Sequence, residues 1–310
     1  MRFTRVWTGS WPRWQLLVDL NDVKPIRSIF RFKHGLRYLM SHNPQFDQAL
    51  REWLDGHQSD ANGVRIVDIG GRQVVVKRRH PTVSSRMIYL LRYVRSWTLS
   101  LICRMTLGEW PSARVLLRNG VDEEAVRMAA LYRAGCHVPK ILHHEPGLLV
   151  ISYAGQDMPY MLRKSQGARE RLEWVMQVAQ DLAKFHQAGF VHGGAQIRNV
   201  MWQDGVFTRI DFEENIGEAL SRPLGQAYDV YQMISSMAGM RGIPANELPI
   251  LCEALLRAYR ASCHDQAVLH QIGRMGRAMG ALADRTRPLL KRLPGRDVRG
   301  FLISADTLRL

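Results

Sequence analysis

Residues 189–213 run GFVHGGAQIRNVMWQDGVFTRIDFE, and this stretch decides how the rest of the chain is interpreted. It is an irregular island in which paired glycines and polar residues alternate with short apolar runs, and no long helical period crosses it. The chain is rich in strand-like segments up to about residue 155 and predominantly helical beyond, with the island among the helices. This order predicts two lobes with a cleft between them, a common place for ligands.

The first half contains the clearest strand signals. Two β-branched runs, Val64–Ile69 and Gln73–Lys77, are joined by a pair of glycines. Paired glycines suit a tight hairpin turn, so a β-hairpin is predicted that ends with the second run. Two further apolar runs, at 138–142 and 148–153, predict a second strand pair.

Helical periodicity marks several other segments. A helix is predicted over 122–133, with Asp122 as a possible cap, acids in its first turn and Ala-Gly after its end. Apolar residues also recur at helical spacing near the N-terminus, in a basic stretch and along the second half. These segments are 44–54, 86–105, 168–188, 226–240 and 246–262.

The composition favours an anionic partner. The 310 residues carry a net charge of +15 with a pI near 10.2, so the surface attracts polyanions such as nucleic acid, anionic lipid or phosphorylated glycans. The four cysteines form no C-x-x-C pair, which argues against a zinc site or a disulfide framework and fits a reducing compartment. Arginines interrupt the first twenty residues and the apolar stretch 87–107, so neither a cleaved signal peptide nor a membrane span is expected.

The island resembles the catalytic and metal-binding loops of protein-kinase-like phosphotransferases. In that family an H-x-D-x-x-x-x-N pattern is followed by a short hairpin and a D-F-G or D-F-E motif. His192 and Asn199 have the family's seven-position spacing, and Asp211 begins the second motif. The resemblance implies ATP as phosphoryl donor and Mg²⁺ held by Asn199 and Asp211, whose oxygen atoms suit this cation. The structural alternative is a strand-end turn beside a loop amide.

The resemblance extends upstream in the expected order. Lys77 is similar to the strand lysine that pairs with the α- and β-phosphates of ATP. Its family partner is a helix glutamate, for which Glu124 is the best match and Glu123 a rival. Residues 122–139 are similar to small bacterial and archaeal kinases related to the KEOPS-complex kinase and to lipopolysaccharide-core (Kdo/heptose) kinases. A solvated lysine, and acids that favour the helix dipole, are the alternatives.

Two other segments fit the same family. Residues 148–155 resemble the strand and hinge against which adenine lies, which implies that the backbone of Ser152, Tyr153 and Ala154 meets the base. Asp229 resembles the helix aspartate that supports the catalytic loop, with a helix N-cap as its alternative role.

The loop departs from the family pattern at Gly194, which occupies the position of the catalytic aspartate. Glycine cannot accept a proton, and general-base catalysis typically contributes about 10²–10⁴-fold. The resemblance gives His192 a supporting role through backbone contacts, and Gln196 and Arg198 are the other catalytic-loop candidates. Arg198 either adds positive charge near phosphate or is a solvated loop arginine. Asp211 or a carboxylate on another loop could orient the acceptor hydroxyl, but the sequence names no replacement.

Two further departures concern the first lobe. No G-x-G-x-x-G precedes the first clear strand, so the usual phosphate-covering loop is in doubt. A basic helical insert at 86–108 lengthens the interval between Lys77 and Glu124. Apolar residues at helical spacing with arginines suit an interfacial helix on anionic lipid, and a core-packed helix with solvated arginines is the alternative.

Together these features predict an α+β protein with a protein-kinase-like two-lobe fold, a small strand-containing N-lobe and a mainly helical C-lobe. The expected organisation is a basic N-terminal extension, an N-lobe containing the insert, a helical C-lobe and a basic C-terminal tail, at residues 1–58, 59–155, 156–283 and 284–310.

The expected activity is transfer of the γ-phosphate of Mg·ATP to a hydroxyl of a protein or a lipid-linked glycan. The alternative is a pseudokinase, a nucleotide-sensing or partner-binding module, because Gly194 replaces the aspartate. A nucleic-acid partner rests on net charge alone and is the weakest interpretation. A cytoplasmic location is expected, either free or peripheral on the cytoplasmic face of the inner membrane.

Overall fold

The computed structural model describes residues 44–57, 62–79, 93, 94, 97, 100, 103, 104, 107–112, 115, 120–290, 292 and 295–310. The expectations for residues 1–43 lie outside the described residues. So does most of the insert 86–108, including Arg86, Arg92 and Arg95; its described positions from 93 to 107 are helical. Among the described residues, no helix is both long and apolar enough to cross a membrane.

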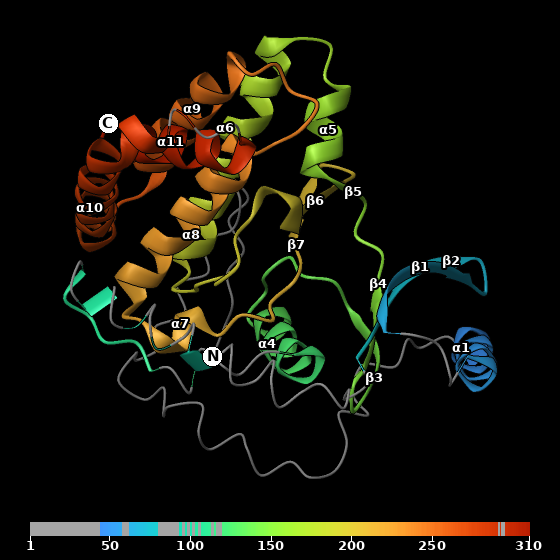
Figure 1. The fold of residues 1–310 in the computed structure, drawn as a ribbon. Coiled ribbons are helices and arrows are strands. Elements are labelled where there is room, and N and C mark those ends of the chain that lie inside the picture. Colours follow the sequence, from blue (N-terminus) through green and yellow to red (C-terminus); the bar gives the residue numbers. More distant parts are fainter. Residues whose placement is uncertain are drawn as a thin grey trace, which may run out of the picture. The chain divides into compact units, whose positions relative to one another are not determined.

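Four antiparallel strands form the first sheet, in the order β1-β2-β4-β3 (Figure 1). Their bounds are Gly63–Ile69 for β1, Arg72–Arg78 for β2, Ile141–Glu145 for β3 and Leu148–Ser152 for β4. β1 and β2 form the predicted hairpin. Its turn residues Gly70 and Gly71 have φ angles of 57° and 74°, which glycine adopts without the steric cost that a side chain would bring.

The second strand pair is displaced from its predicted position. β3 begins at Ile141 rather than at 138, and the two histidines that were expected between the strands lie within it. The turn is made by Pro146 and Gly147, and Gly147 has a φ of 78°. Proline and glycine are stronger turn formers than histidine, which explains the shift.

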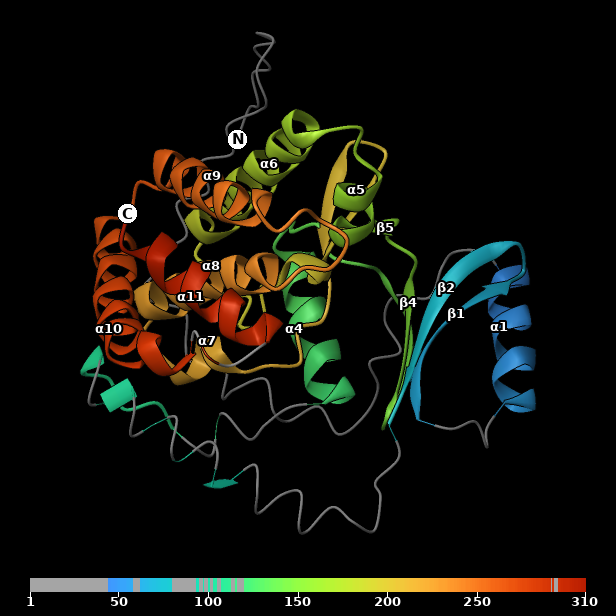
Figure 2. The same ribbon diagram turned by 45° about the horizontal axis from the view of Figure 1, so that its top comes forward.

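Helices cover both faces of this sheet (Figure 2). On one face, α1 (Pro44–Gly56) packs Phe46 and Leu50 against apolar side chains of β1 and β2. On the other face, α4 (Val121–Arg133) contacts β3 and β4. Helix α1 therefore shares a core with the sheet, although the predicted boundary at residue 58 would separate them.

The rest of the described chain is mainly helical. Helix α6 packs against α9, and α8 contacts α9, α10 and α11 (Figure 1). Their apolar faces form one core that includes Leu182, Val230 and Leu255, all fully buried. The bounds are Met158–Lys164 for α5, Ala168–Gln187 for α6, Ile216–Ala219 for α7, Arg222–Ala238 for α8, Glu247–Ser262 for α9, Gln266–Leu290 for α10 and Arg296–Leu308 for α11.

A second, three-stranded antiparallel sheet lies in this helical part, in the order β5-β6-β7. Its strands are Gln156–Asp157, Val200–Gln203 and Val206–Arg209. Strands of two to four residues are too short to show a period of two, so only the family resemblance pointed to the β6–β7 hairpin. The α+β class, with a small antiparallel sheet and a mostly helical remainder, is confirmed.

The C-terminal residues 284–310 differ from the expected tail. Helix α10 continues across residue 284 to Leu290, and α11 packs against α8, α9 and α10. Ser304, Ala305 and Leu308 are buried on α11. The basic residues that suggested a tail lie beside small and apolar residues that give α11 one face for packing.

Candidate functional site

A buried lysine connects the first sheet to the island. The ammonium Nζ of Lys77, on β2, lies 2.7 Å and 2.9 Å from the two carboxylate oxygens of Glu124 and 3.7 Å from Oδ1 of Asp211. Glu124 is fully buried. Burial raises the pKa of this carboxyl, and the Lys77 charge and hydrogen bonds act in the opposite direction. Lys77, Glu124 and Asp211, predicted from distant segments, are therefore neighbours.

Helix α4 selects Glu124 over its rival Glu123. Val121, Glu124, Ala125 and Met128 are buried at the three- and four-residue spacing of one helix face. Glu123 lies off that face and is half-buried. The expected cap also changes, because Gly120 is the N-cap of α4.

Asp122, the expected cap, instead lies in the first turn of α4. Its Oδ1 is 2.9 Å from Nε2 of His144 and accepts a hydrogen bond from the backbone N–H of Gly147. The Asp122 side chain thus links α4 to the β3–β4 turn and does not cap the N-terminus of the helix.

Asn199 precedes β6 and Asp211 follows β7, so the two residues lie side by side at the open end of the β6–β7 hairpin. Asn199 ends the short 3-10 helix η2 (Ile197–Asn199), and its amide nitrogen donates to the carbonyl of Gly194 at 2.8 Å and to Oδ2 of Asp211 at 3.4 Å. Asp211 has a left-handed φ of 68°, which aspartate tolerates better than most residues. Because the amide nitrogen is used within the loop, the amide oxygen is the atom that would meet a cation.

The donor set fits magnesium. Asn199 and Asp211 offer the amide and carboxylate oxygens that this ion prefers. Carboxylate oxygens of Glu124, Asp211 and Glu213 also lie within 4.8 Å of one another, although Glu124 pairs with Lys77 and Glu213 pairs with Arg79 at 2.8 Å. The metal-binding role of Asn199 and Asp211 stays a prediction that this chemistry favours.

Asp229, a buried residue of α8, supports the loop at residues 192–199. Its carboxylate accepts hydrogen bonds from the backbone N–H groups of His192 at 2.6 Å and Gly193 at 2.8 Å, and it lies 3.1 Å from Nε2 of His186. Burial opposes its ionisation, but the His186 hydrogen bond and neighbouring groups bring the pKa of Asp229 below its usual value. Asp229 lies in the interior of α8, which excludes the alternative N-cap role.

His192 is buried and stacks on Phe212, with ring centroids 4.3 Å apart. Burial lowers its pKa from 6.5 to about 3, so the imidazole is neutral at physiological pH. Its Nδ1 accepts a hydrogen bond from the N–H of Gly194. These contacts are those of a residue that shapes the loop, as the family resemblance implies.

Arg127, which the sequence did not single out, ties helix α4 to the island. Its guanidinium donates to the carbonyls of Phe212 at 2.8 Å, Glu214, Val191 at 3.4 Å and His192 at 3.0 Å. Burial lowers the pKa of this arginine. Its position three residues after Glu124 is the only sequence signal, because carbonyl partners 64 to 87 residues away leave no pattern.

The remaining candidates in the loop are Gly194, Gln196 and Arg198. Gly194 is buried, Gln196 is half-buried and Arg198 is exposed. Gln196 contributes backbone hydrogen bonds, donating to the carbonyl of Gly194 at 2.7 Å and accepting from the N–H of Asn199 at 2.9 Å. The structure therefore gives Gln196 a place in the loop's backbone, and a catalytic role for Gln196 or Arg198 stays a prediction.

The expected hinge lies at the end of β4, but part of its backbone is already paired. The N–H of Ser152 donates to the carbonyl of Lys140 at 2.9 Å, and that of Tyr153 donates to the carbonyl of Gln73 at 3.4 Å. An adenine base would therefore be bound through hinge carbonyls or through Ala154.

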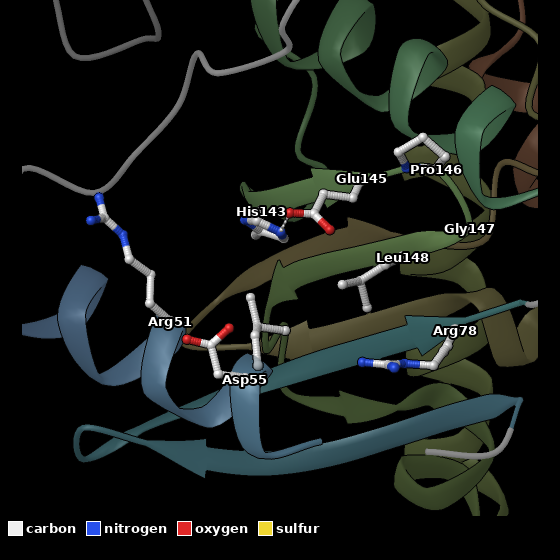
Figure 3. A pocket seen from close by; sticks show the side chains of 9 residues that line it. Arg51, Asp55, Arg78, His143, Glu145, Pro146, Gly147 and Leu148 are labelled. Carbon is white, nitrogen blue, oxygen red and sulfur yellow. Dashed lines mark ion pairs between the residues drawn. The ribbon is translucent and has the colours of Figure 1, made fainter. Parts of the chain in front are cut away.

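A cavity of about 500 Å³ lies on the other side of the sheet, beside α1 (Figure 3). Its lining includes Arg51 of α1, Arg78 of β2 and the ion pair between His143 and Glu145 of β3. Side chains of successive strand residues point to opposite faces, so Arg78 faces this cavity and Lys77 faces α4. The cavity is distinct from the Lys77 site.

Comparison with known proteins supports the kinase-like interpretation. The RIO domain, an atypical protein-kinase-like family, matches residues 106–220, which include Glu124, the loop at 192–199 and Asp211. The match supports a relationship to the protein-kinase-like superfamily.

Among solved structures, a MAP kinase from Leishmania major matches at 15% sequence identity. The match covers 82% of this chain and 80% of that one, with a TM-score of 0.32. No curated protein sequence is significantly similar to the chain.

Proposed function

We propose that this protein is an ATP-dependent phosphotransferase that moves the γ-phosphoryl group of Mg·ATP to a hydroxyl acceptor. The observation that carries the proposal is the buried ammonium of Lys77, held by both oxygens of Glu124 and 3.7 Å from Asp211. The RIO-domain similarity over residues 106–220 supports the same reaction class.

A purely structural role explains this cluster poorly. Burying a lysine and a glutamate costs several kcal/mol per ion in desolvation, and the attraction of the pair often only offsets that cost. Apolar residues of similar size would hold α4 against β2 equally well. A cationic group beside Asp211 suits an anionic ligand, and triphosphate is such a ligand.

The residues then have distinct proposed tasks. Lys77 binds the α- and β-phosphates, and Glu124 keeps its ammonium in place. Asn199 and Asp211 would hold Mg²⁺, which neutralises phosphate charge in this type of reaction. Asp229 and His192 keep the loop that carries Asn199 in shape through the hydrogen bonds described above.

The acceptor and the location are further parts of the proposal. We propose a hydroxyl on a protein or a lipid-linked glycan, and a cytoplasmic protein that is either free or peripheral on the inner membrane. These rest on the sequence resemblance and the net charge of +15. Flotation with anionic and with neutral vesicles separates the two locations, because only a peripheral protein would float with the anionic vesicles alone.

The second candidate function is a pseudokinase that binds nucleotide or a partner without transferring phosphate. Gly194 at the position of the catalytic aspartate favours it. The element before β1 favours it too, because helix α1 lies there and no glycine-rich phosphate loop is found among the described residues.

Thermal unfolding with and without Mg·ATP tests the proposed binding site, on the wild type, Asp211→Asn and Asp204→Asn. Asp204 is exposed in the β6–β7 turn with a φ of 49°, which asparagine tolerates, so it is a matched control. Ligand at a hundred times its Kd stabilises by about 2.7 kcal/mol. We expect stabilisation in the wild type and in Asp204→Asn, only with magnesium, and little in Asp211→Asn.

Turnover then separates the two functions. ADP formation that disappears in Asp211→Asn supports the phosphotransferase, whereas nucleotide binding without turnover supports the pseudokinase. Absence of any nucleotide effect on the wild type would contradict both nucleotide-binding functions.

A further inference from the structure

The missing aspartate leaves a definite space. A Cβ atom added to Gly194 would lie 3.8 Å from the carbonyl oxygen of Asp211, 3.9 Å from Cδ of Glu214 and 4.0 Å from the amide nitrogen of Asn199. These are ordinary van der Waals distances. Gly194 also has no positive φ, so neither backbone conformation nor close packing requires glycine there.

One of those three neighbours is itself a carboxylate. Cδ of Glu214 lies within 4 Å of the point where an aspartate side chain at position 194 would begin. Glu214 is an exposed residue. It comes three positions after Asp211 in the order Asp-Phe-Glu-Glu.

Two features place the backbone of Glu214 close to the loop. The guanidinium of Arg127 donates to the Glu214 carbonyl. Gly193 has a φ of 89°, and a Cβ there would lie only 2.6 Å from the same carbonyl oxygen. Gly193 thus permits the close approach that brings Glu214 to the space beside Gly194.

We propose that Glu214 is the general base of this site and replaces the aspartate that Gly194 lacks. This inference rests on the phosphotransferase function proposed above. The acceptor oxygen attacks the γ-phosphorus of ATP, and the bond to the bridging oxygen breaks with its electron pair leaving on ADP. The hydroxyl proton moves to a Glu214 carboxylate oxygen and from there to water.

The test measures ADP formation from Mg·ATP by the full chain, with water as the probe acceptor, in parallel with the rise in Tm that nucleotide produces. Glu214→Gln removes the base with little change in size, and Glu218→Gln is the matched control at an exposed glutamate of α7. We expect Glu214→Gln to lower kcat by about 10²-fold or more with an unchanged nucleotide effect on Tm. Glu218→Gln should retain the wild-type rate.

Rescue gives the decisive comparison. Gly194→Asp places a carboxylate in the same space from the other loop, so Gly194→Asp/Glu214→Gln should regain at least about 10-fold of the lost rate, which lies within the range for a general base. Wild-type turnover in Glu214→Gln overturns the inference. So does a loss of rate that Gly194→Asp does not restore, or one that follows weaker nucleotide binding.

The same experiment separates this inference from the proposed function. Turnover that depends on Asp211 but not on Glu214 supports the phosphotransferase function and contradicts the role of Glu214 as general base. A wild type that binds nucleotide but forms no ADP removes both the base and the transfer activity. If Mg·ATP does not raise the Tm of the wild type, the proposed nucleotide-binding site is contradicted.

Discussion

The two sides of the loop at 192–199 differ in how closely they follow the kinase pattern. On the buried side, Asp229 binds two backbone N–H groups and His192 stacks on Phe212, as the resemblance implies. On the other side, Gly194 occupies the position that the resemblance gives to the catalytic aspartate, and the Glu214 side chain lies beside it from another loop. The buried N–H groups of His192 and Gly193 need an acceptor at one fixed place, whereas an exposed carboxylate near Gly194 can be supplied from more than one position.

The largest expected effect is on the buried side, at Asp229. Asp229→Asn leaves an amide facing the N–H groups of His192 and Gly193 and removes the charge that they bind. We expect a loss of about 3–5 kcal/mol in the free energy of unfolding, measured by urea denaturation. The exposed Asp204→Asn should lose less than about 0.5 kcal/mol. Equal stability of the two variants would contradict the importance of this support.

The adjacent glycines of the loop give the next comparison. Gly193→Ala forces a φ of 89° on a residue with a side chain and places its Cβ 2.6 Å from the Glu214 carbonyl oxygen. We expect a loss of about 2–3 kcal/mol. Gly194→Ala meets nothing closer than 3.8 Å and should be near neutral. Unfolding curves of the two variants check this, and a greater loss for Gly194→Ala would mean that the loop has another conformation.

Arg127 connects two segments of the site, because its carbonyl partners lie at residues 191–192 and at residues 212–214. Arg127→Met removes these hydrogen bonds and should cost about 2 kcal/mol in stability and weaken the effect of Mg·ATP on Tm. The control is Arg133→Met, at an exposed arginine of the same helix. An Arg127→Met protein with wild-type nucleotide binding would show that the nucleotide site does not depend on these hydrogen bonds.

The smallest effect, taken per pH unit, is the dependence of stability on pH. In the folded protein His192 has a pKa of about 3, whereas a histidine in the unfolded chain has a pKa near 6.5. Below about pH 6.5 the unfolded state therefore binds a proton at this residue and the folded state does not. Stability should fall toward acid by about 1.4 kcal/mol per pH unit for this group. Burial also lowers the pKa of His186, which adds to the slope.

Urea denaturation at pH 7 and pH 5 measures this slope, and His270→Gln, at an exposed histidine, should leave it unchanged. Equal stability of the wild type at the two pH values would place His192 in a more solvated environment than the structure gives it.

Local signals predicted much of the fold and part of the site. The glycine pair at 70–71 fixed the first hairpin, and apolar periodicity found α6 within one residue at each end. The spacing of His192, Asn199 and Asp211 in the sequence indicated a kinase-like loop. The strands β5 to β7 and the packed helix α11 were not predicted from periodicity, because such short strands carry no period and α11 directly follows a basic stretch at residues 285–296.

The sequence by itself determined which chemical groups this protein has: one strand lysine, a helix acid, an amide and a carboxylate at kinase-like spacing, and a glycine where a base is expected. Only the tertiary structure decided which of them meet. Lys77 pairs with Glu124 rather than Glu123, Arg127 reaches carbonyls on two loops, and Glu214 lies beside Gly194. Hydrogen bonds and ion pairs depend on distances of a few ångström in space, and such proximity between distant segments exists only after the helices and sheets have packed.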